Sequence, residues 1–200
     1  MFERFPVFTT ETAPTDSRAT LVHLEKTLGV IPNLAAAMAG SPSLIKGFAK
    51  LREVYYEESS LSPVEVQVLS LTNAYENRCR YCMAIHSAFA VKEGLSEESL
   101  AALREGQPPV EPRLRALSDL SRALIQTRGQ VGDGELEAFC EAGFTPAQAL
   151  EVVLGVAVSI LANYSHHLTE APVDRAFSRY AWTPPETPAG VPVPVGAAAS

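Results

Sequence analysis

Positive charge, cysteine and long apolar runs are all scarce in this sequence, and each shortage excludes a class of protein. The 200 residues carry 16 Lys and Arg against 23 Asp and Glu, a net charge of −7. A surface that binds nucleic acid through its phosphates is therefore not expected. Three cysteines are too few for a disulfide scaffold. The longest apolar stretch, residues 152–162, falls short of the roughly 18 residues that span a bilayer, so no membrane contact is expected.

The N-terminus does not resemble a targeting sequence. MFERFPVF has an acid at Glu3 and no apolar run behind a basic start, so it does not read as a signal peptide. We therefore expect a cytoplasmic protein with reduced thiols. In that compartment a close cysteine pair is more often redox-active or metal-binding than structural.

Helix signals dominate the chain, while sustained apolar–polar alternation and Asn-Gly or Asp-Gly hairpin turns are missing. The sequence predicts an all-α protein with three parts. Residues 1–15 form an N-terminal arm and residues 16–182 a helical domain. Residues 183–200, rich in proline and alanine, form a flexible tail without a core.

The expected helices begin at clear capping signals. Residues 62–65 read Ser-Pro-Val-Glu, a capping box with proline at the first helical position, and residues 145–148 repeat the device as Thr-Pro-Ala-Gln. An internal duplication would explain this similarity, and so would two unrelated buried helices. Asp16 is expected to cap a helix that ends at Gly29. Further helices are expected from Ser41 and over about 96–104, 113–128, 134–141 and 173–180.

The side chains best suited to catalysis lie close together in residues 76–86, ENRCRYCMAIH. Cys79, Cys82 and His86 fall within an arc of about 60° on one helix face. We expect Cys79 near a helix N-terminus, where unpaired N–H groups favour a thiolate. His86 lies one turn after Cys82 and can accept its proton. The three residues together supply a nucleophile, a resolving thiol and a base.

Three interpretations of the cysteine pair remain open. The thiols can pack as small apolar residues. They can bind zinc with further ligands among His86, His166 and His167, although a second Cys-x-x-Cys is missing. They can also carry reversible dithiol chemistry, the interpretation that we prefer. The two adjacent histidines otherwise read as residues at a helix end, and the lone Cys140 reads as a core residue.

The motif and its surroundings resemble the alkylhydroperoxidase AhpD-like branch of the carboxymuconolactone decarboxylase family, in particular its peroxidase-related subgroup. The resemblance lies in ENRCRYCMAIH and the preceding LSPVEVQVLSLTNAY. It extends to GVIPNLAAAMAGSPSLIKGF upstream and ANYSHHLTEAPVDRAF downstream. It covers roughly residues 21–180.

The resemblance implies an AhpD-like multi-helix bundle that assembles as a trimer or hexamer. It also implies reduction of a hydroperoxide by the cysteine pair, with electrons from a lipoyl-bearing or other dithiol partner and no cofactor or metal. By position, Cys82 would be the peroxidatic thiol, Cys79 the resolving thiol and His86 part of the proton relay. The decarboxylase branch lacks this pair, which argues against lactone decarboxylation.

One position departs from the family pattern. The family relay uses a glutamate twelve residues before the first cysteine, where this chain has Gln67. An amide cannot take a proton at neutral pH. Glu76 can replace it only if the chain bends before Cys79. The alternatives are therefore a dithiol oxidoreductase or redox sensor without efficient peroxide turnover, or a non-enzymatic metal-binding or assembly protein.

Overall fold

The computed structural model describes residues 5–185, which form helices and no strand, so the all-α prediction is confirmed. Residues 1–4 of the predicted arm and 186–200 of the predicted tail lie outside the described part. The elements are α1 (Thr15–Leu28), α2 (Asn33–Met38), α3 (Pro42–Glu57), α4 (Pro63–Glu76), α5 (Arg80–Lys92), α6 (Glu97–Arg104), α7 (Pro112–Gln126), α8 (Asp133–Glu141), α9 (Pro146–Thr169) and the 3₁₀ segment η1 (Arg175–Tyr180).

Local capping chemistry sets where the long helices begin. Ser62 and Glu65 form the predicted capping box at α4, and Thr145 and Gln148 form the one at α9. Asp16 is not a cap, which corrects the prediction. Pro14 holds that position, and Asp16 lies in the first turn of α1, where its charge still favours the positive helix end.

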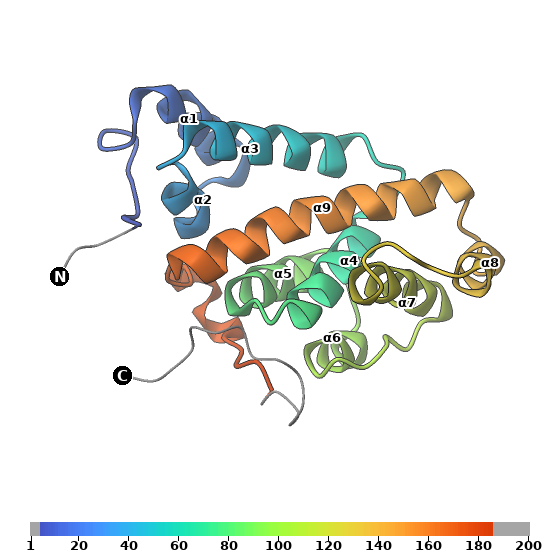
Figure 1. Cartoon of the computed structure of the whole chain (residues 1–200). Helices are drawn as coiled ribbons and strands as arrows, with labels where there is room; N and C mark the ends of the chain where they lie inside the picture. The colour runs from blue at the N-terminus through green and yellow to red at the C-terminus, as the bar shows by residue number, and fades with distance from the viewer. Residues whose placement is uncertain (1–4, 186–200) are drawn as a thin grey trace.

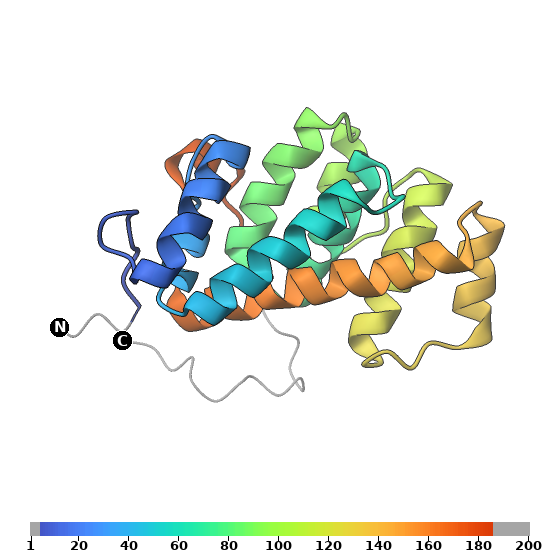
Figure 2. The ribbon, with the colours of Figure 1, turned by 90° about the horizontal axis from the view of Figure 1, so that it is seen from above.

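α4 is the central helix, and every residue from Glu65 to Ala74 is buried. It packs against α5, α6, α7 and α9. Figures 1 and 2 show α1, α2 and α3 gathered on one side of the long α9, with α4 to α8 on the other. Residues of α4 therefore contact both α5 and α9, so polar and thiol side chains from three helices can meet at one site. The internal duplication of α4 and α9 stays a prediction.

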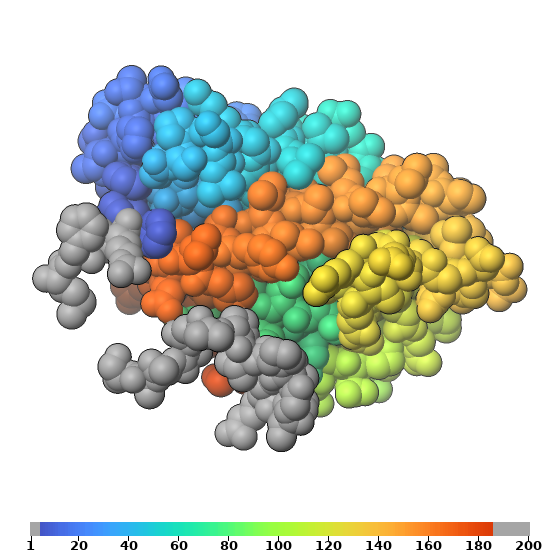
Figure 3. All heavy atoms as spheres, in the orientation of Figure 1, coloured from blue at the N-terminus to red at the C-terminus, as the bar shows by residue number. Residues whose placement is uncertain are grey.

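α9 is long and apolar enough to cross a membrane by length and composition alone. In this fold it is a bundle helix that contacts α2, α3, α4, α5, α7 and α8. At Gly155 it approaches α3 so closely that an added Cβ would lie 2.7 Å from the Tyr55 ring. Its other face carries an exposed apolar stripe, which we define as Leu150, Val153, Tyr164 and Leu168. Figure 3 shows α9 crossing the surface between the two groups of helices.

The chain after α9 returns to the bundle and closes one end of it. The helix expected over 173–180 is a 3₁₀ segment that begins at Arg175 and packs on α5. Trp182 then donates a hydrogen bond from Nε1 to the Arg104 carbonyl at 2.9 Å and lies beside Tyr75. This return positions Asp174 next to the start of α5.

Candidate active site

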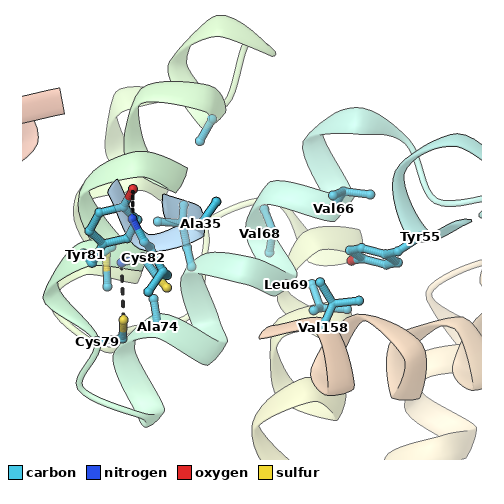
Figure 4. Close-up of a cluster of buried hydrophobic side chains, with 14 of the residues drawn as sticks. Ala35, Tyr55, Val66, Val68, Leu69, Ala74, Cys79, Tyr81, Cys82 and Val158 are labelled. Atoms are coloured by element: carbon cyan, nitrogen blue, oxygen red, sulfur yellow. Dashed lines mark hydrogen bonds between the residues drawn. The ribbon is translucent and has the colours of Figure 1, made fainter. Parts of the chain in front are cut away.

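The two cysteines of the pair lie at the junction of α4 and α5. α4 ends at Glu76, and Cys79 is the N-cap of α5, as the sequence predicts. The Cys79 sulfur accepts a hydrogen bond from the Cys82 backbone N–H at 3.4 Å (Figure 4). The cysteine thus takes the place of a capping Ser or Asp, and the positive end of the helix dipole lies on its sulfur. Both thiols are free and buried.

Cys79 is the thiol that ionises first. Burial raises the pKa of its thiol, but the hydrogen bond from the Cys82 thiol and the nearby His166 ring outweigh burial and lower the pKa to about 5. The same hydrogen bond to Cys79, together with burial, raises the pKa of Cys82 well above its usual value. At neutral pH the pair therefore holds one proton, which sits on Cys82, and Cys79 is a thiolate.

His166 lies beside Cys79, although the sequence suggested it only as a possible zinc ligand and otherwise as a residue at a helix end. Its side chain is 3% exposed, and its ring lies 5.6 Å from that of Tyr81. Neither ring nitrogen makes a regular hydrogen bond, yet the ring is close enough to Cys79 to lower its pKa. The sequence did contain a sign that His166 is buried. His166 continues, at helical spacing, the face of α9 that also carries Val152, Gly155, Ser159 and Asn163, all of them buried.

Residues from three separate segments hold the Tyr81 and His166 rings in place. The Tyr81 hydroxyl donates to Asp174 Oδ2 at 2.5 Å, and Asp174 Oδ1 accepts from the Asn33 backbone N–H at 3.0 Å. Asp174 itself is buried. The orientation of the His166 ring therefore depends on contacts between α2, α5 and the segment before η1.

The second histidine, His167, is exposed and has a different role. Its Nε2 donates to the Asn77 carbonyl at 2.7 Å, and the Asn77 amide donates to Asn163 Oδ1 at 2.9 Å. Asn163 in turn hydrogen-bonds the Cys82 thiol and lowers its pKa against the stronger effect of Cys79. These bonds tie the turn between α4 and α5 to α9.

The structure brings His86 and Gln67 together, as the family pattern implies for those positions. His86 Nδ1 lies 2.9 Å from Gln67 Oε1. With this amide oxygen as the acceptor, Nδ1 carries the ring proton and Nε2 is left as a proton acceptor. Burial, and the charge of Arg52, lower the pKa of His86 to about 3, so the ring is neutral at physiological pH.

Glu76 lies on the side of α4 that faces α7. Its carboxylate accepts from Arg122 Nε at 2.8 Å and from Gln126 at 3.0 Å. The chain does bend between α4 and α5, as the hypothesis required, but the bend leaves Glu76 in this ion pair. The structure therefore does not bring Glu76 to Cys79, Cys82 or His86.

A recess of about 720 Å³, including its solvent-open mouth, lies over Cys82 and His86. Its walls are mainly apolar and come from α1, α2, α3, α4, α5 and α9. Besides Cys82 and His86, the polar groups that line it are few: Arg52, Tyr56, Ser70, Tyr81, Ser159 and Asn163. Cys79 is not part of the lining, so Cys82 is the thiol that a ligand in this recess would meet.

Metal ligands do not gather at this site. Within residues 5–185, no group of three or more His, Cys, Asp or Glu side chains is arranged to hold a metal ion. A zinc site at Cys79 and Cys82 would need further ligands of this kind close to the two thiols.

Comparison with known proteins finds a family match over part of the chain. Residues 42–118, which include α4, α5 and both cysteines, match the carboxymuconolactone decarboxylase family. A search of curated proteins finds no match to the chain.

Solved structures share the fold at low sequence identity. An AhpD-core, uncharacterized peroxidase-related protein from Ralstonia eutropha JMP134 superposes with a TM-score of 0.77 at 21% identity, covering 87% of this chain and 93% of that one. An uncharacterized peroxidase-related protein from Silicibacter sp. TM1040 gives 0.73 at 17% identity, covering 87% and 92%. A cysteine-to-alanine variant of the debrominase Bmp8, in complex with 2,3,4-tribromopyrrole, gives 0.74 at 15% identity, covering 90% and 96%.

The family match over the helices that carry the cysteine pair agrees with the AhpD-like fold of the whole described chain. Part of the chain, residues 42–118, thus matches the carboxymuconolactone decarboxylase family, and the described chain has the AhpD-like all-helical fold.

Proposed function

We propose that the protein is an antioxidant thiol peroxidase that reduces organic hydroperoxides through Cys79 and Cys82. One observation carries the proposal: two free, buried thiols lie together at a helix N-terminus, and the sulfur of Cys82 lines an apolar recess. Such a pair holds a ready thiolate beside a thiol that a substrate can reach. Low thiol pKa and access to substrate are the properties that make a cysteine reactive.

In the first half-reaction, Cys82 attacks the terminal oxygen of the hydroperoxide. Cys82 gives its proton to the Cys79 thiolate as the new S–O bond forms, and the O–O bond breaks to leave an alkoxide. That proton then passes from Cys79 to the alkoxide, which leaves Cys79 a thiolate again, so thiol plus hydroperoxide gives sulfenic acid plus alcohol. We assign the relay of this proton to His86 Nε2, because His86 lines the recess together with Cys82.

In the second half-reaction, Cys79 closes the disulfide. Its thiolate attacks the Cys82 sulfenic sulfur, and the peroxide oxygen leaves as hydroxide, which takes a proton from solvent to form water. A reduced dithiol, such as a lipoyl-bearing protein, then returns two electrons, restores the Cys79 thiolate and the Cys82 thiol, and releases its second proton to solvent. Cys140, on α8, has no part in this cycle.

Peroxide consumption with thiol mapping tests the proposal. Reduced protein is mixed with excess cumene hydroperoxide, with and without reduced lipoamide as donor, and the remaining thiols are alkylated for mass spectrometry. We expect one equivalent of peroxide consumed without donor, continuous turnover with it, a Cys79–Cys82 disulfide, and Cys140 alkylated. A linkage that includes Cys140, or no loss of peroxide, would contradict the proposal.

Reductive dehalogenation is a second candidate, because a debrominase with a bound bromopyrrole shares the fold and the recess over Cys82 is apolar. A bromoarene and two thiols would give the arene, a disulfide, bromide and a proton. Bromide release from 2,3,4-tribromopyrrole separates the two reactions. Disulfide formation without turnover of either substrate would favour a dithiol oxidoreductase or redox sensor, and stoichiometric zinc would favour a metal-binding protein.

Gln67→Glu is expected to strengthen the proton relay. A carboxylate in place of the amide would hold the His86 Nδ1 proton more firmly and stabilise the imidazolium, which raises the pKa of His86 from its depressed value. We expect Cys82 oxidation in single-turnover experiments to accelerate roughly tenfold or more. Gln107→Glu, on an exposed loop, adds the same charge elsewhere and should leave the rate unchanged. A raised His86 pKa in an NMR titration without acceleration would show that His86 does not relay the proton.

We also propose that copies of this chain assemble through the apolar stripe on α9, as a trimer or hexamer. Leu150 and Leu168 are 73% and 70% exposed, and exposed apolar surface along a helix is typical of an interface. Light scattering after size exclusion should give a mass several times 21.5 kDa. Leu150→Glu with Leu168→Glu should lower it, and Lys46→Glu on α3 should not. A wild-type monomer at micromolar concentration would refute the assembly.

A further inference from the structure

The recess over Cys82 adjoins a second cavity at a half-buried cation. This outer cavity, about 800 Å³ including its open solvent space, shares Leu28, Arg52, Tyr56 and Phe89 with the first. Because these four residues line both spaces, Arg52 lies at the boundary between them and also lines the recess that holds Cys82. The outer cavity adds Lys92 and Glu93 at its rim.

Arg52 has no acidic partner in the described part of the chain. None of the four ion pairs in this part includes Arg52, and no hydrogen bond of its guanidinium is found there. Its neighbour Glu53 is paired with Lys50 at 3.1 Å. Glu93, across the outer cavity, is not within ion-pair distance either. The guanidinium instead lies 4.3 Å from the centre of the Tyr56 ring, which fixes its plane and leaves its donors available.

The walls of the recess around Cys82 make few favourable contacts with a small polar ligand. Around Cys82 the recess is lined by Leu24, Leu34, Phe48, Ile85, Phe89 and Val158. Hydrogen peroxide gains nothing from such walls, whereas each buried methylene of a larger ligand is worth about 0.8 kcal/mol. Apolar walls with few polar groups are typical of sites that bind organic molecules.

We propose that this site takes an organic molecule with an apolar body and one carboxylate, the carboxylate paired with Arg52 and the body lying in the recess against Cys82. The inference rests on the proposed function only in naming Cys82 as the reacting atom; binding itself does not depend on the reaction. A guanidinium presents paired N–H donors that match the two oxygens of a carboxylate. Within the peroxidase reaction, the substrate class is therefore a hydroperoxide of a carboxylic acid.

Protection of Cys82 from alkylation tests binding without any redox step. Octanoate and octan-1-ol share one chain length and differ in charge. Each is titrated against the rate at which N-ethylmaleimide modifies Cys82, followed by mass spectrometry. In the wild type we expect octanoate to protect at a concentration roughly tenfold or more below that of octan-1-ol, because hydrogen bonds to a charged group are the stronger kind.

Matched variants assign this advantage to Arg52. In Arg52→Gln the two compounds should protect equally, in Arg52→Lys part of the advantage should remain, and in Lys46→Gln, an exposed cation on the same helix, it should be unchanged. Melting curves establish that each variant is folded. Equal protection by both compounds in the wild type, or an undiminished advantage in Arg52→Gln, would overturn the inference.

Turnover then separates this inference from the proposed function. Linoleic acid hydroperoxide and its methyl ester carry the same peroxide, and kcat/KM should favour the acid in the wild type and favour neither in Arg52→Gln. If neither compound is consumed but octanoate still protects Cys82, the peroxidase proposal fails and the anion site stands. If both are consumed equally by the wild type, the peroxidase proposal stands and the anion site fails.

Discussion

Cys82→Ser is expected to abolish peroxide consumption. Cys82 is the thiol of the pair that lines the recess, while Cys79 is fully buried behind it. A serine hydroxyl keeps the shape of the site but is a far weaker nucleophile, so the single-turnover rate should fall by several orders of magnitude. A ferrous-oxidation assay for residual cumene hydroperoxide measures the loss.

Cys79→Ser is the matched variant and should behave differently. Cys82 should still react once with the peroxide, but more slowly, because the neighbouring thiolate that accepts its proton is gone. The product has no resolving thiol, so a sulfenic acid should persist on Cys82 and be trapped by dimedone. Cys140→Ser should match the wild type in both assays, since Cys140 lies on α8, away from the pair.

The opposite labelling pattern would reverse the roles of the two thiols. If dimedone marks Cys79 in the Cys82→Ser protein while Cys82 stays inert in Cys79→Ser, then the thiol that ionises first is also the one that attacks. That outcome is chemically accessible, since the pKa of Cys79 is the lower of the two. It would require the peroxide to pass beyond the recess and reach a fully buried sulfur.

The helices and the position of Cys79 could be predicted because local chemistry determines them. Ser62-Pro63 and Thr145-Pro146 supply a cap and a fixed φ within four residues, so α4 and α9 begin where the sequence says. The same reasoning failed at Asp16, where a proline two residues earlier took the cap position. The short α2 carries no such signal, and only its burial against α9 and α3 identifies it.

The charge state of the site could not be predicted, because it depends on residues far apart in the chain. The spacing of Cys82 and His86 suggested that His86 takes the Cys82 proton, yet the structure bonds His86 to Gln67 and aligns Cys82 with Cys79 and Asn163. Glu76 is likewise near the pair in sequence but is bonded to Arg122, 46 residues away. Only tertiary packing decides which of these partners a side chain meets.

His166→Gln is expected to raise the pKa of Cys79. After the Cys82 thiol, the His166 ring is the neighbour that does most to lower this pKa to about 5. A close partner that favours the charged form typically shifts a pKa by about one unit or more, so the thiolate midpoint should rise by a similar amount. The ultraviolet absorbance of the thiolate, followed against pH in a Cys140→Ser background, measures it without requiring access to the buried sulfur.

The pH dependence of single-turnover oxidation should shift together with the pH midpoint of Cys79 ionisation. Cys79 has a lowered pKa in the folded protein, so its thiolate is present at neutral pH and is lost as the pH falls through about 5. Below that pH the pair holds two protons, Cys79 can no longer accept one from Cys82, and single-turnover oxidation should fall. His86, with a pKa of about 3, stays neutral throughout this range and does not mask the effect.

In His166→Gln the same loss should begin at higher pH, while His167→Gln, one residue away and exposed, should keep the wild-type profile. An unchanged thiolate midpoint in His166→Gln would show that the helix N-terminus and Cys82 alone stabilise the Cys79 thiolate.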